Sequence, residues 1–425
     1  GFGIAGFAAI PEGSEVWQVR DYAFWQRVAF HFEHPDWVSL FGRCTVSFWD
    51  LIQPAFMFMV GVAMPFSYAR RSAQSQSSIR PALHALWRSL VLVLLGVFLS
   101  SPGHPATNWV FPNVLAQIGL GYFFVYLCLG RGRVFQYSVL SAVLLGYWAL
   151  FFFNPPVEGW DSAAVNASEE RGEVFHGRFA AWSKNGNIAH DFDQWLLLKL
   201  RNPPPAVGDD ADSNADSNAD SEPVADAVPL TGVRRWFFSN PEPYPFNSGG
   251  YTTLNFIPST ATTLLGVLCG QLLLSSSYSA WKRFLLLVAA GAVCLVAGVL
   301  AHHTVCPVVK RIWTPSWVLF SGGYVIWMLA LFYLLFDILP FRILAWPLVV
   351  VGANSIMMYM MGQLWRGWVL DKIVRLHFTN MIESLLGPHA LAADWYGPIT
   401  EKTAAFVVFW LVAFWMYRNR YLVRI

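Results

Sequence analysis

The chain alternates between apolar blocks about 20 residues long and shorter polar segments. The first complete block, "FWDLIQPAFMFMVGVAMPFSY" (48–68), holds a single charged residue, and further blocks of similar length follow it. A helix needs about 20 apolar residues to cross the hydrocarbon core of a bilayer. We therefore predict membrane-spanning helices at 48–68, 84–101, 110–130, 134–153, 254–274, 284–301, 315–337, 343–364 and 403–417.

Two apolar stretches do not fit this length. The opening "GFGIAGFAAI" is too short to span, and we interpret it as the tail of a span that begins upstream. Residues 366–391 are interrupted by charges, which favours an amphipathic helix over a span. The predicted fold class is an all-α integral membrane bundle of about ten transmembrane helices with a large external loop. Its parts are 1–153 (first bundle half), 154–252 (external loop) and 253–425 (second bundle half).

Composition agrees with a membrane protein. Hydrophobic residues make up 56% of the chain and charged residues 13%, against about 45–50% and 25% in soluble domains. No Walker A loop, dinucleotide fingerprint, nucleophile elbow or pair of CxxC motifs occurs, so the common soluble-enzyme sites are not indicated. We expect the lipid bilayer as a partner, no nucleic acid, and leave a homodimer open.

Positive charge orients the predicted bundle, because short cytoplasmic loops carry excess Lys and Arg. Five alternate segments are basic: Arg70, Arg71 and Arg80; Arg131 and Arg133; Lys282 and Arg283; Arg342; Arg418, Arg420 and Arg424. This predicts that the C-terminus lies in the cytoplasm. We expect the protein to be in the bacterial inner (plasma) membrane. The segments predicted outside are 11–46, 102–109, 154–252, 302–314 and 365–402. Lys310 and Arg311 are the contrary signal, since the scheme places them outside.

The long outer loop has two unlike parts. Residues 209–227 repeat a short acidic unit with almost no apolar side chains and are predicted to be disordered. Residues 177–200 instead carry an apolar periodicity typical of a helix on the outer surface. The polar run Lys184, Asn185 and Asn187 before that helix is a candidate sugar-binding element, and a solvated helix start is the alternative.

The stretch "HFEHPDW" (31–37) gathers titratable groups just before the first complete span. His31 and His34 with a carboxylate could ligate a metal, but the pattern lacks further ligands. A set of solvated loop residues is a second interpretation. Acid–base or nucleophilic chemistry by a histidine of this stretch is the third, because histidine exchanges protons near neutrality. Asp50, at the mouth of a span, strengthens it. We favour the third interpretation, and we expect no metal.

Several segments together resemble a known family. "HPDW" followed by "WDLIQPAFMFMVGVAMPFS" is similar to the opening of the transmembrane acetyltransferases related to heparan-α-glucosaminide N-acetyltransferase. "NVLAQIGLGY", "NIAHDFDQWLL", "TATTLLGVLCGQLL", "KRIWTPSWVLFSGG" and "VVGANSIMMYM" resemble later family segments in the same order. Collinearity of six segments is more specific than any one of them.

The resemblance implies transfer of an acetyl group from cytoplasmic acetyl-CoA to an amino or hydroxyl group of an external saccharide. The family's catalytic histidine falls on His34, either as a base or as a transient acetyl carrier, and Asp50 would orient it or bind the acceptor. Candidate donor-binding residues are Asn354, Ser355, Gln117, Arg70, Arg71 and Arg88. Interhelical hydrogen bonding explains Asn354 and Ser355 equally well, and topology alone explains the arginines.

The chain also departs from the family. Ala116 and Gln117 stand where a Gln-Arg pair is usual, and Asn247 and Ser248 replace a common acidic residue. These departures leave the acceptor open and allow an inactive or repurposed member. The alternative function is a solute or glycan transporter or flippase without acyl transfer, although no internal repeat of the kind common in transporters is found.

Overall fold

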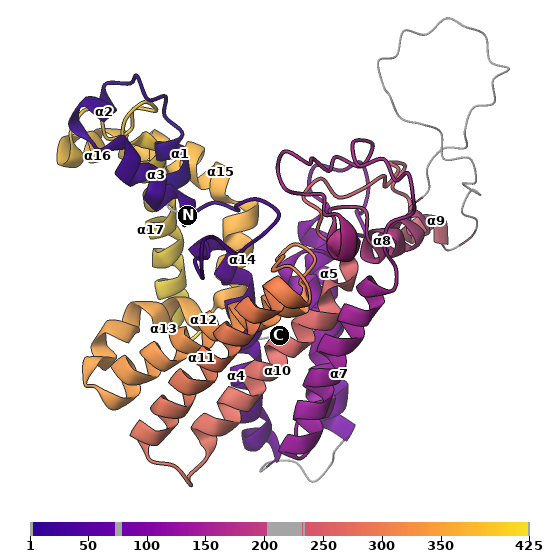
Figure 1. Cartoon of the computed structure of the whole chain (residues 1–425). Coiled ribbons are helices and arrows are strands. Elements are labelled where there is room, and N and C mark those ends of the chain that lie inside the picture. Colours follow the sequence, from indigo (N-terminus) through magenta and orange to yellow (C-terminus); the bar gives the residue numbers. More distant parts are fainter. Residues whose placement is uncertain (1–2, 73–78, 202–231, 233, 424–425) are drawn as a thin grey trace, which may run out of the picture. The chain divides into compact units, whose positions relative to one another are not determined.

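The computed structural model describes residues 3–72, 79–201, 232 and 234–423 (Figure 1). Within these ranges the secondary structure is helical, apart from one isolated bridge between Phe41 and Thr45. The predicted disordered insert 209–227 lies outside the described residues. The α-helices are α1 Ile4–Ala8, α2 Val16–Val19, α3 Tyr22–Phe30, α4 Phe48–Ser72, α5 Ile79–Leu99, α6 Val114–Cys128, α7 Arg133–Phe152, α8 Ile188–Leu198, α9 Arg234–Phe237, α10 Phe256–Leu274, α11 Ala280–Thr304, α12 Pro315–Tyr333, α13 Trp346–Gly352, α14 Ser355–Leu364, α15 Arg366–Val369, α16 Thr379–Leu386 and α17 Gly397–Arg418.

Seven of the described helices are long and apolar enough to cross a membrane. They are α4, α5, α7, α10 with the turn before it, α11, α12 with its extension to Ile338, and α17. Each coincides with a predicted span, which confirms the prediction of a helical protein with helices of membrane-spanning length. The total of ten spans stays a prediction.

The predicted span 110–130 is shorter in the structure. The helix α6 begins only at Val114, because Asn113 has extended backbone angles and its side chain accepts a hydrogen bond from the Ala116 amide. It ends at Cys128, and Gly130 follows in the left-handed region with φ of 75°. Fifteen residues at 1.5 Å each reach about 22 Å, less than the roughly 30 Å hydrocarbon core.

The predicted span 343–364 is broken. Residues Phe341–Gly352 and Ser355–Leu364 meet at an angle of 60°. Asn354 stands at the break with non-helical backbone angles, and its side chain holds the end of the chain. Its Nδ2 donates to the Tyr421 oxygen at 3.1 Å, and its Oδ1 accepts from the Val423 amide at 2.8 Å. The segment at Tyr421 and Val423, about 70 residues later in the chain, therefore stabilises the break between α13 and α14.

The chain forms two compact units, which we describe separately. Unit 1 comprises Gly1–Ala73, Thr262–Lys310 and Ser316–Ile425, and unit 2 comprises Gln74–Ala261 and Arg311–Pro315. This division follows spatial contacts and differs from the three sequence segments 1–153, 154–252 and 253–425, which remain a prediction.

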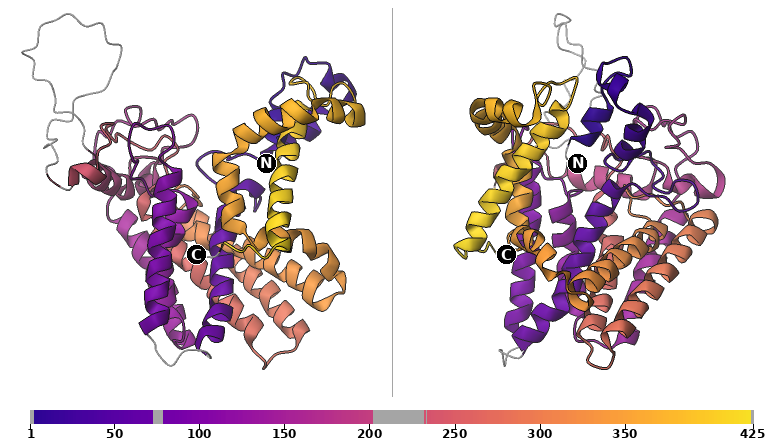
Figure 2. Two further views of the ribbon diagram at one scale, coloured as in Figure 1. Left: turned by 180° about the vertical axis from the view of Figure 1, so that it is seen from behind. Right: turned by 90° about the vertical axis from the view of Figure 1, so that its left-hand side faces the viewer.

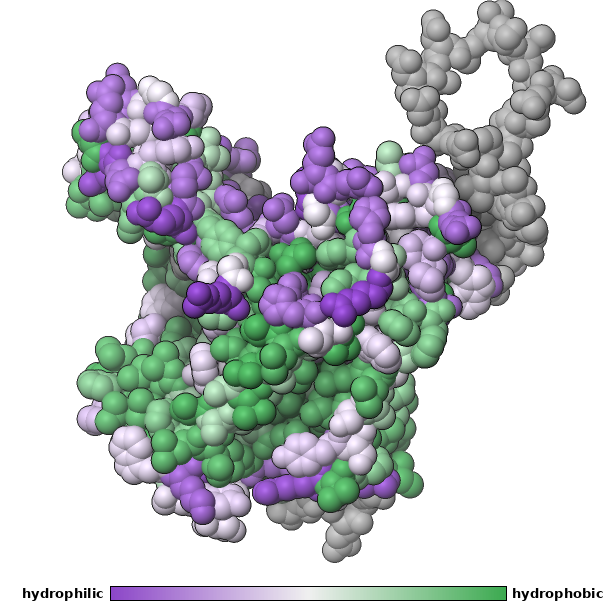
Figure 3. Space-filling view, in the orientation of Figure 1, coloured by the Kyte–Doolittle hydropathy of each residue, from purple (hydrophilic) through white to green (hydrophobic). Residues whose placement is uncertain are grey.

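In unit 1, α4 and α10 cross at closely packed backbones. A Cβ on Gly61 would overlap the backbone oxygen of Thr263, and one on Gly266 would overlap that of Phe58. Small residues allow such close approach between membrane helices. Figure 3 shows that the face of α11 to α13 is strongly apolar, as expected for a surface in contact with lipid. The exposed side chains of α11 and α12 include Val293, Val296, Leu300, Leu331 and Phe332.

The region predicted as an amphipathic helix, 366–391, is helical from α15 through the π-helical residues Leu370–Phe378 to α16. Its buried side chains Val374 and Ile382 share a cluster with Phe409 of α17, which lies beside it (Figure 2). The polar side is exposed. These contacts fit a helix that packs on one face.

In unit 2, α5 and α6 also pack through small residues. A Cβ on Gly119 would lie 2.7 Å from the backbone oxygen of Ser89. The Asn113 side chain that caps α6 also donates to the Gly96 oxygen of α5 at 2.7 Å. The polar residues of "NVLAQIGLGY" thus fix where these two apolar helices meet.

Candidate functional site

The loop that carries His34 lies between α3 and α4 in unit 1. The Ser47 hydroxyl donates to the Glu33 oxygen at 2.8 Å, and the Trp49 amide donates to the His31 oxygen at 3.0 Å. Trp37 is fully buried. These contacts hold the loop against the first turn of α4.

Asp50 lies in that first turn and is only 2% exposed. The partial positive charge at a helix N-terminus favours a carboxylate there. Its Oδ1 is 2.8 Å from the Nδ1 of His34, whose side chain is 43% exposed. The two residues predicted as catalytic are therefore in direct contact, with one buried and the other accessible.

Lys310 completes the cluster, and the sequence analysis did not assign it to a site. Its Nζ lies 3.0 Å from Asp50 Oδ1 and 3.2 Å from His34 Nδ1. It is 3% exposed. The loop and the Lys310 segment are joined by the backbone, because the Ser39 amide donates to the Val308 oxygen at 2.9 Å. We call His34, Asp50 and Lys310 the His34 site.

The contacts of His34 favour the tautomer that carries its proton on Nδ1. An ionised carboxylate only accepts hydrogen bonds, so a bond from His34 to Asp50 requires the proton on Nδ1. The Asp50 contact is shorter than the Lys310 contact, and Lys310 has its own acceptor in Asp50. The lone pair is then on Nε2, which makes no hydrogen bond to any described residue.

This arrangement suits a histidine that reacts through Nε2. Asp50 orients the imidazole and stabilises the imidazolium that forms when Nε2 takes a proton. Lys310 balances the buried carboxylate, which unpaired would be costly in this environment. A base or a nucleophile can be built in this way.

The exposed side chains of His31, Glu33 and Asp36 fit the interpretation of solvated loop residues. His31 is exposed, and no group of three or more His, Cys, Asp or Glu side chains suited to a metal ion occurs among the described residues. Cys44 and Cys306, which lie in predicted external segments, are both free thiols. The Cys306 thiol instead lies 3.4 Å from the Ser316 hydroxyl.

Two predicted donor-binding residues lie in unit 2. Gln117 is 1% exposed, and its Nε2 donates to the backbone oxygens of Thr252 and Thr253 at 3.3 and 3.1 Å. Arg88 donates to the Tyr122 hydroxyl at 3.3 Å and stacks over that ring at 4.9 Å. Both side chains therefore have structural partners, and a role in donor binding stays a prediction.

The other predicted donor contacts are in unit 1. Arg70 and Arg71 end α4, and their side chains lie outside the described residues. The amide of Asn354 is occupied by the C-terminal segment, as described above, whereas Ser355 is exposed. The His34 site and these residues are thus not brought together by any described contact.

The predicted sugar-binding run is buried instead of solvated. Lys184 is 2% exposed and pairs with Glu173 at 2.9 Å. The Asn187 side chain caps α8, and the Nδ2 of Asn185 donates to the oxygens of Val165 and Asn247 at 2.9 and 3.0 Å. The predicted helix is confirmed as α8. Lys184 has a structural partner, while Asn185 and Asn187 border a cavity.

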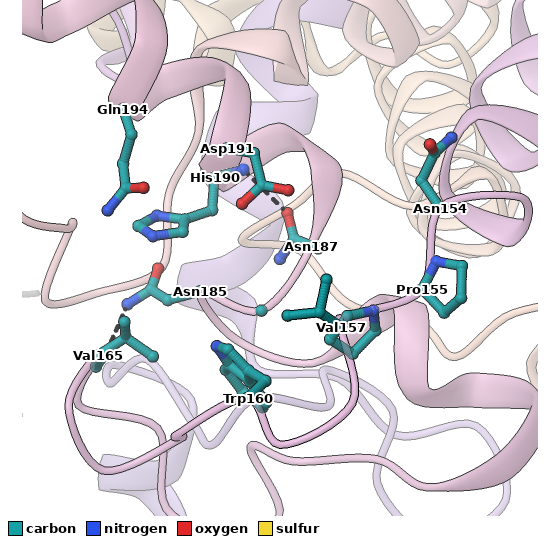
Figure 4. A pocket seen from close by; sticks show the side chains of 12 residues that line it. Asn154, Pro155, Val157, Trp160, Val165, Asn185, Asn187, His190, Asp191 and Gln194 are labelled. Atoms are coloured by element: carbon teal, nitrogen blue, oxygen red, sulfur yellow. Dashed lines mark hydrogen bonds between the residues drawn. The ribbon is translucent and has the colours of Figure 1, made fainter.

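That cavity lies in unit 2 and encloses about 370 Å³ (Figure 4). It is lined by the segment after α7, by Asn185 to Asn187 and by the first turns of α8, and its residues are Asn154, Pro155, Pro156, Val157, Trp160, Val165, Asn185, Gly186, Asn187, His190, Asp191 and Gln194. The volume falls in the range of small-molecule sites.

Burial changes the titration of three acid–base groups of α8. It lowers the pKa of the His190 imidazole to about 4. It raises the pKa of the Asp191 carboxyl, and it raises the pKa of Asp193 to about 7. Asp193 is not part of the cavity lining and accepts the Thr253 amide at 2.9 Å. His190 is therefore neutral near pH 7.

Neither Lys310 nor His190 was predicted from the sequence to be a site residue. The available signal for Lys310 was a positive charge in a loop predicted to be external, where the positive-inside rule expects few Lys or Arg residues. For His190 it was a histidine within "NIAHDFDQWLL", one of the segments that resemble the acetyltransferase family. No protein-family model matches the chain, and no curated protein matches it. The functional argument accordingly rests on the geometry of the chain and on the resemblance of its short segments described above.

Proposed function

We propose that the chain is a membrane-bound acyltransferase that moves an acetyl group from cytoplasmic acetyl-CoA to an amino or hydroxyl group of an external saccharide. The observation that carries this proposal is the His34 site: an accessible histidine whose Nδ1 is 2.8 Å from a buried carboxylate. The resemblance to the acetyltransferases related to heparan-α-glucosaminide N-acetyltransferase supplies the reaction class.

The proposed chemistry uses the free nitrogen of His34. The acceptor amine or hydroxyl attacks the thioester carbonyl, and Nε2 takes the proton that it releases. The C–S bond then breaks, the acetyl group stays on the acceptor, and the thiolate of CoA takes up the proton. Asp50 stabilises the imidazolium between these steps. Holding donor and acceptor together adds the gain from proximity.

The proposal includes a topology. Ten spans result if α6, the broken pair α13–α14 and the apolar stretch at residues 1–10 cross in addition to the seven long helices. The His34 loop and the segment 154–252 lie outside, and the C-terminus lies in the cytoplasm of a bacterial cell. Lys310 does not argue against this orientation, because it is buried and paired with Asp50.

The test separates donor binding from transfer. Purified protein in detergent is given acetyl-CoA, and its thermal unfolding and its retention of radiolabel are measured. A donor at 100 times its dissociation constant stabilises the folded state by about 2.7 kcal/mol. Amino sugars and glycan fragments are then screened as acceptors of the labelled acetyl group.

The matched variants are His34→Ala and His31→Ala. We expect His34→Ala to bind acetyl-CoA but to transfer about 10² to 10⁴ times more slowly, the usual contribution of a general base. His31 is exposed and outside the His34 site, so His31→Ala should remain active. Full transfer by His34→Ala would refute the mechanism. Absence of acetyl-CoA binding by folded protein would favour the transporter.

A further inference from the structure

Three basic residues lie along one side of α5 in unit 2. Arg80, His84 and Arg88 are spaced four residues apart, so they follow one another on the same side of the helix. We call them the basic strip. Arg80 is exposed, whereas His84 and Arg88 are half-buried. The basic strip thus runs from the exposed start of α5 into a helix that is long and apolar enough to cross a membrane.

Arg88 is the deepest residue of the basic strip, and no carboxylate of the described residues pairs with it. It is the tenth residue of α5, about 13 Å from the start of the helix. Its Nη1 donates to the Tyr122 hydroxyl at 3.3 Å, and its buried Nε has no acceptor among the described residues. A guanidinium is always charged and has five N–H donors. Most of these donors therefore remain for an anionic ligand.

The helix α6 adds hydroxyl groups beside the basic strip. The two helices run antiparallel, because Asn113 donates to the Gly96 oxygen whereas Tyr122 contacts Arg88. One further turn of each helix brings Tyr126 to the level of His84. The Tyr122 hydroxyl accepts from Arg88, so its own proton is available to an acceptor. Cations and hydroxyl donors along one helix pair are the groups that bind phosphate oxygens.

The surroundings favour a phospholipid over a soluble anion. On the neighbouring side of α5, the apolar side chains of Trp87, Leu90 and Leu94 are exposed. A phospholipid fits both features, since its phosphate meets the basic strip while an acyl chain lies along these side chains. Arginine side chains within a span extend toward the level of the lipid phosphates, and tryptophan is enriched there.

We propose that the basic strip, with Tyr122 and Tyr126, binds the phosphate of an anionic phospholipid in the leaflet next to the Arg80 end of α5. Arg88 holds the phosphate at the deepest point, and Arg80 attracts the headgroup. The bound lipid stabilises the contact between α5 and α6. This site goes beyond the proposed acyl transfer and does not depend on it.

The test is titration of delipidated full-length protein in a neutral detergent with phosphatidylglycerol, read by native mass spectrometry and thermal unfolding. Wild-type protein should retain the lipid saturably and unfold at a higher temperature, because a ligand that binds only the folded state stabilises it. Phosphatidylcholine carries a balancing cation and should bind about fivefold more weakly. Arg80→Gln should weaken phosphatidylglycerol binding about fivefold, and Arg88→Gln about tenfold or more, because its hydrogen bonds to phosphate are charge-assisted.

The matched control is Arg133→Gln. Arg133 is an exposed arginine at the start of α7, outside the basic strip, so its loss should change binding less than about twofold. If Arg88→Gln does not fold, Arg88→Lys and Arg80→Gln decide the outcome. Equal stabilisation by both lipids, or equal losses in Arg133→Gln and the strip variants, overturns the proposal. Displacement of the lipid by inorganic phosphate or by acetyl-CoA also overturns it, since the basic strip would then bind a soluble anion.

Discussion

Replacing Lys310 by methionine should destabilise unit 1 strongly, although the new side chain is apolar and of similar length. Lys310 and Asp50 are 3% and 2% exposed, and their charged atoms are 3.0 Å apart. Lys310→Met leaves a buried carboxylate whose remaining partner is His34. Asp50→Asn leaves a buried ammonium instead.

The structure sets the size of this effect. Two unit charges 3.0 Å apart attract by about 5.5 kcal/mol at an effective dielectric constant of 20. The cost of removing both charges from water offsets most of this gain, so loss of the whole pair is often nearly neutral. Loss of one partner leaves the other charge buried and unpaired, which lowers the free energy of unfolding by about 3–5 kcal/mol. We expect each single variant to lose that much and Asp50→Asn/Lys310→Met to lose less than either.

Thermal unfolding in detergent measures the cycle. At about 2–4 °C per kcal/mol for a folding unit of this size, each single variant should unfold roughly 6–20 °C below wild type. The double variant should recover part of that loss. If the losses of the two single variants add in the double variant, the two charges are not coupled. The Lys310–Asp50 pair would then not stabilise the His34 site. Transfer should stay impaired in the double variant, since the neutral amide introduced by Asp50→Asn cannot stabilise an imidazolium.

Three further outcomes test packing, titration and orientation. Gly266→Ala should lower the free energy of unfolding by about 1–3 kcal/mol or more, because the new Cβ overlaps α4. Gly146→Ala has open space around it and should raise the stability slightly. Thermal unfolding of the two variants distinguishes these outcomes. Burial raises the pKa of Asp193 from 3.8 to about 7, so wild-type stability relative to Asp193→Asn should fall by about 3 kcal/mol as pH rises from 4 to 7, and a flat difference would contradict the shift. An impermeant maleimide should label Cys44 in intact cells, and Arg131→Cys in a Cys44→Ser background only after permeabilisation.

The apolar helices could be predicted because their signal is local. The length of an uninterrupted apolar run decides whether a helix can span, and α4, α5 and α11 are set by such runs. The break before Ser355 could not be predicted in this way. It depends on an amide that holds the Val423 segment, and no local property of "VVGANSIMMYM" specifies that partner.

Some residues of the candidate site could likewise be predicted from the sequence, and others could not. His34 and Asp50 are 16 residues apart, and a histidine before a span whose mouth bears a carboxylate is visible in the sequence. Lys310 is 260 residues from Asp50, and only the folded chain pairs them. Lys184 shows the same limit: the sequence offers it as a candidate sugar-binding residue or as part of a solvated helix start, and only the folded chain pairs it with Glu173 in a buried ion pair.

The contact between Lys310 and Asp50 also constrains the proposed topology. Because the two side chains touch within unit 1, the chain must cross the membrane an even number of times between them. Five long helices intervene, namely α4, α5, α7, α10 and α11, and five is odd. If all five span, the short helix α6 has to be the sixth crossing, with local thinning of the bilayer making up for its length. The proposed topology then has Arg131 and Cys44 on opposite sides of the membrane, as the positive charge of the Arg131 loop requires. Lys310 thus no longer counts against the proposed orientation once its partner is known, because a buried, paired lysine is not the exposed loop charge on which the positive-inside rule depends.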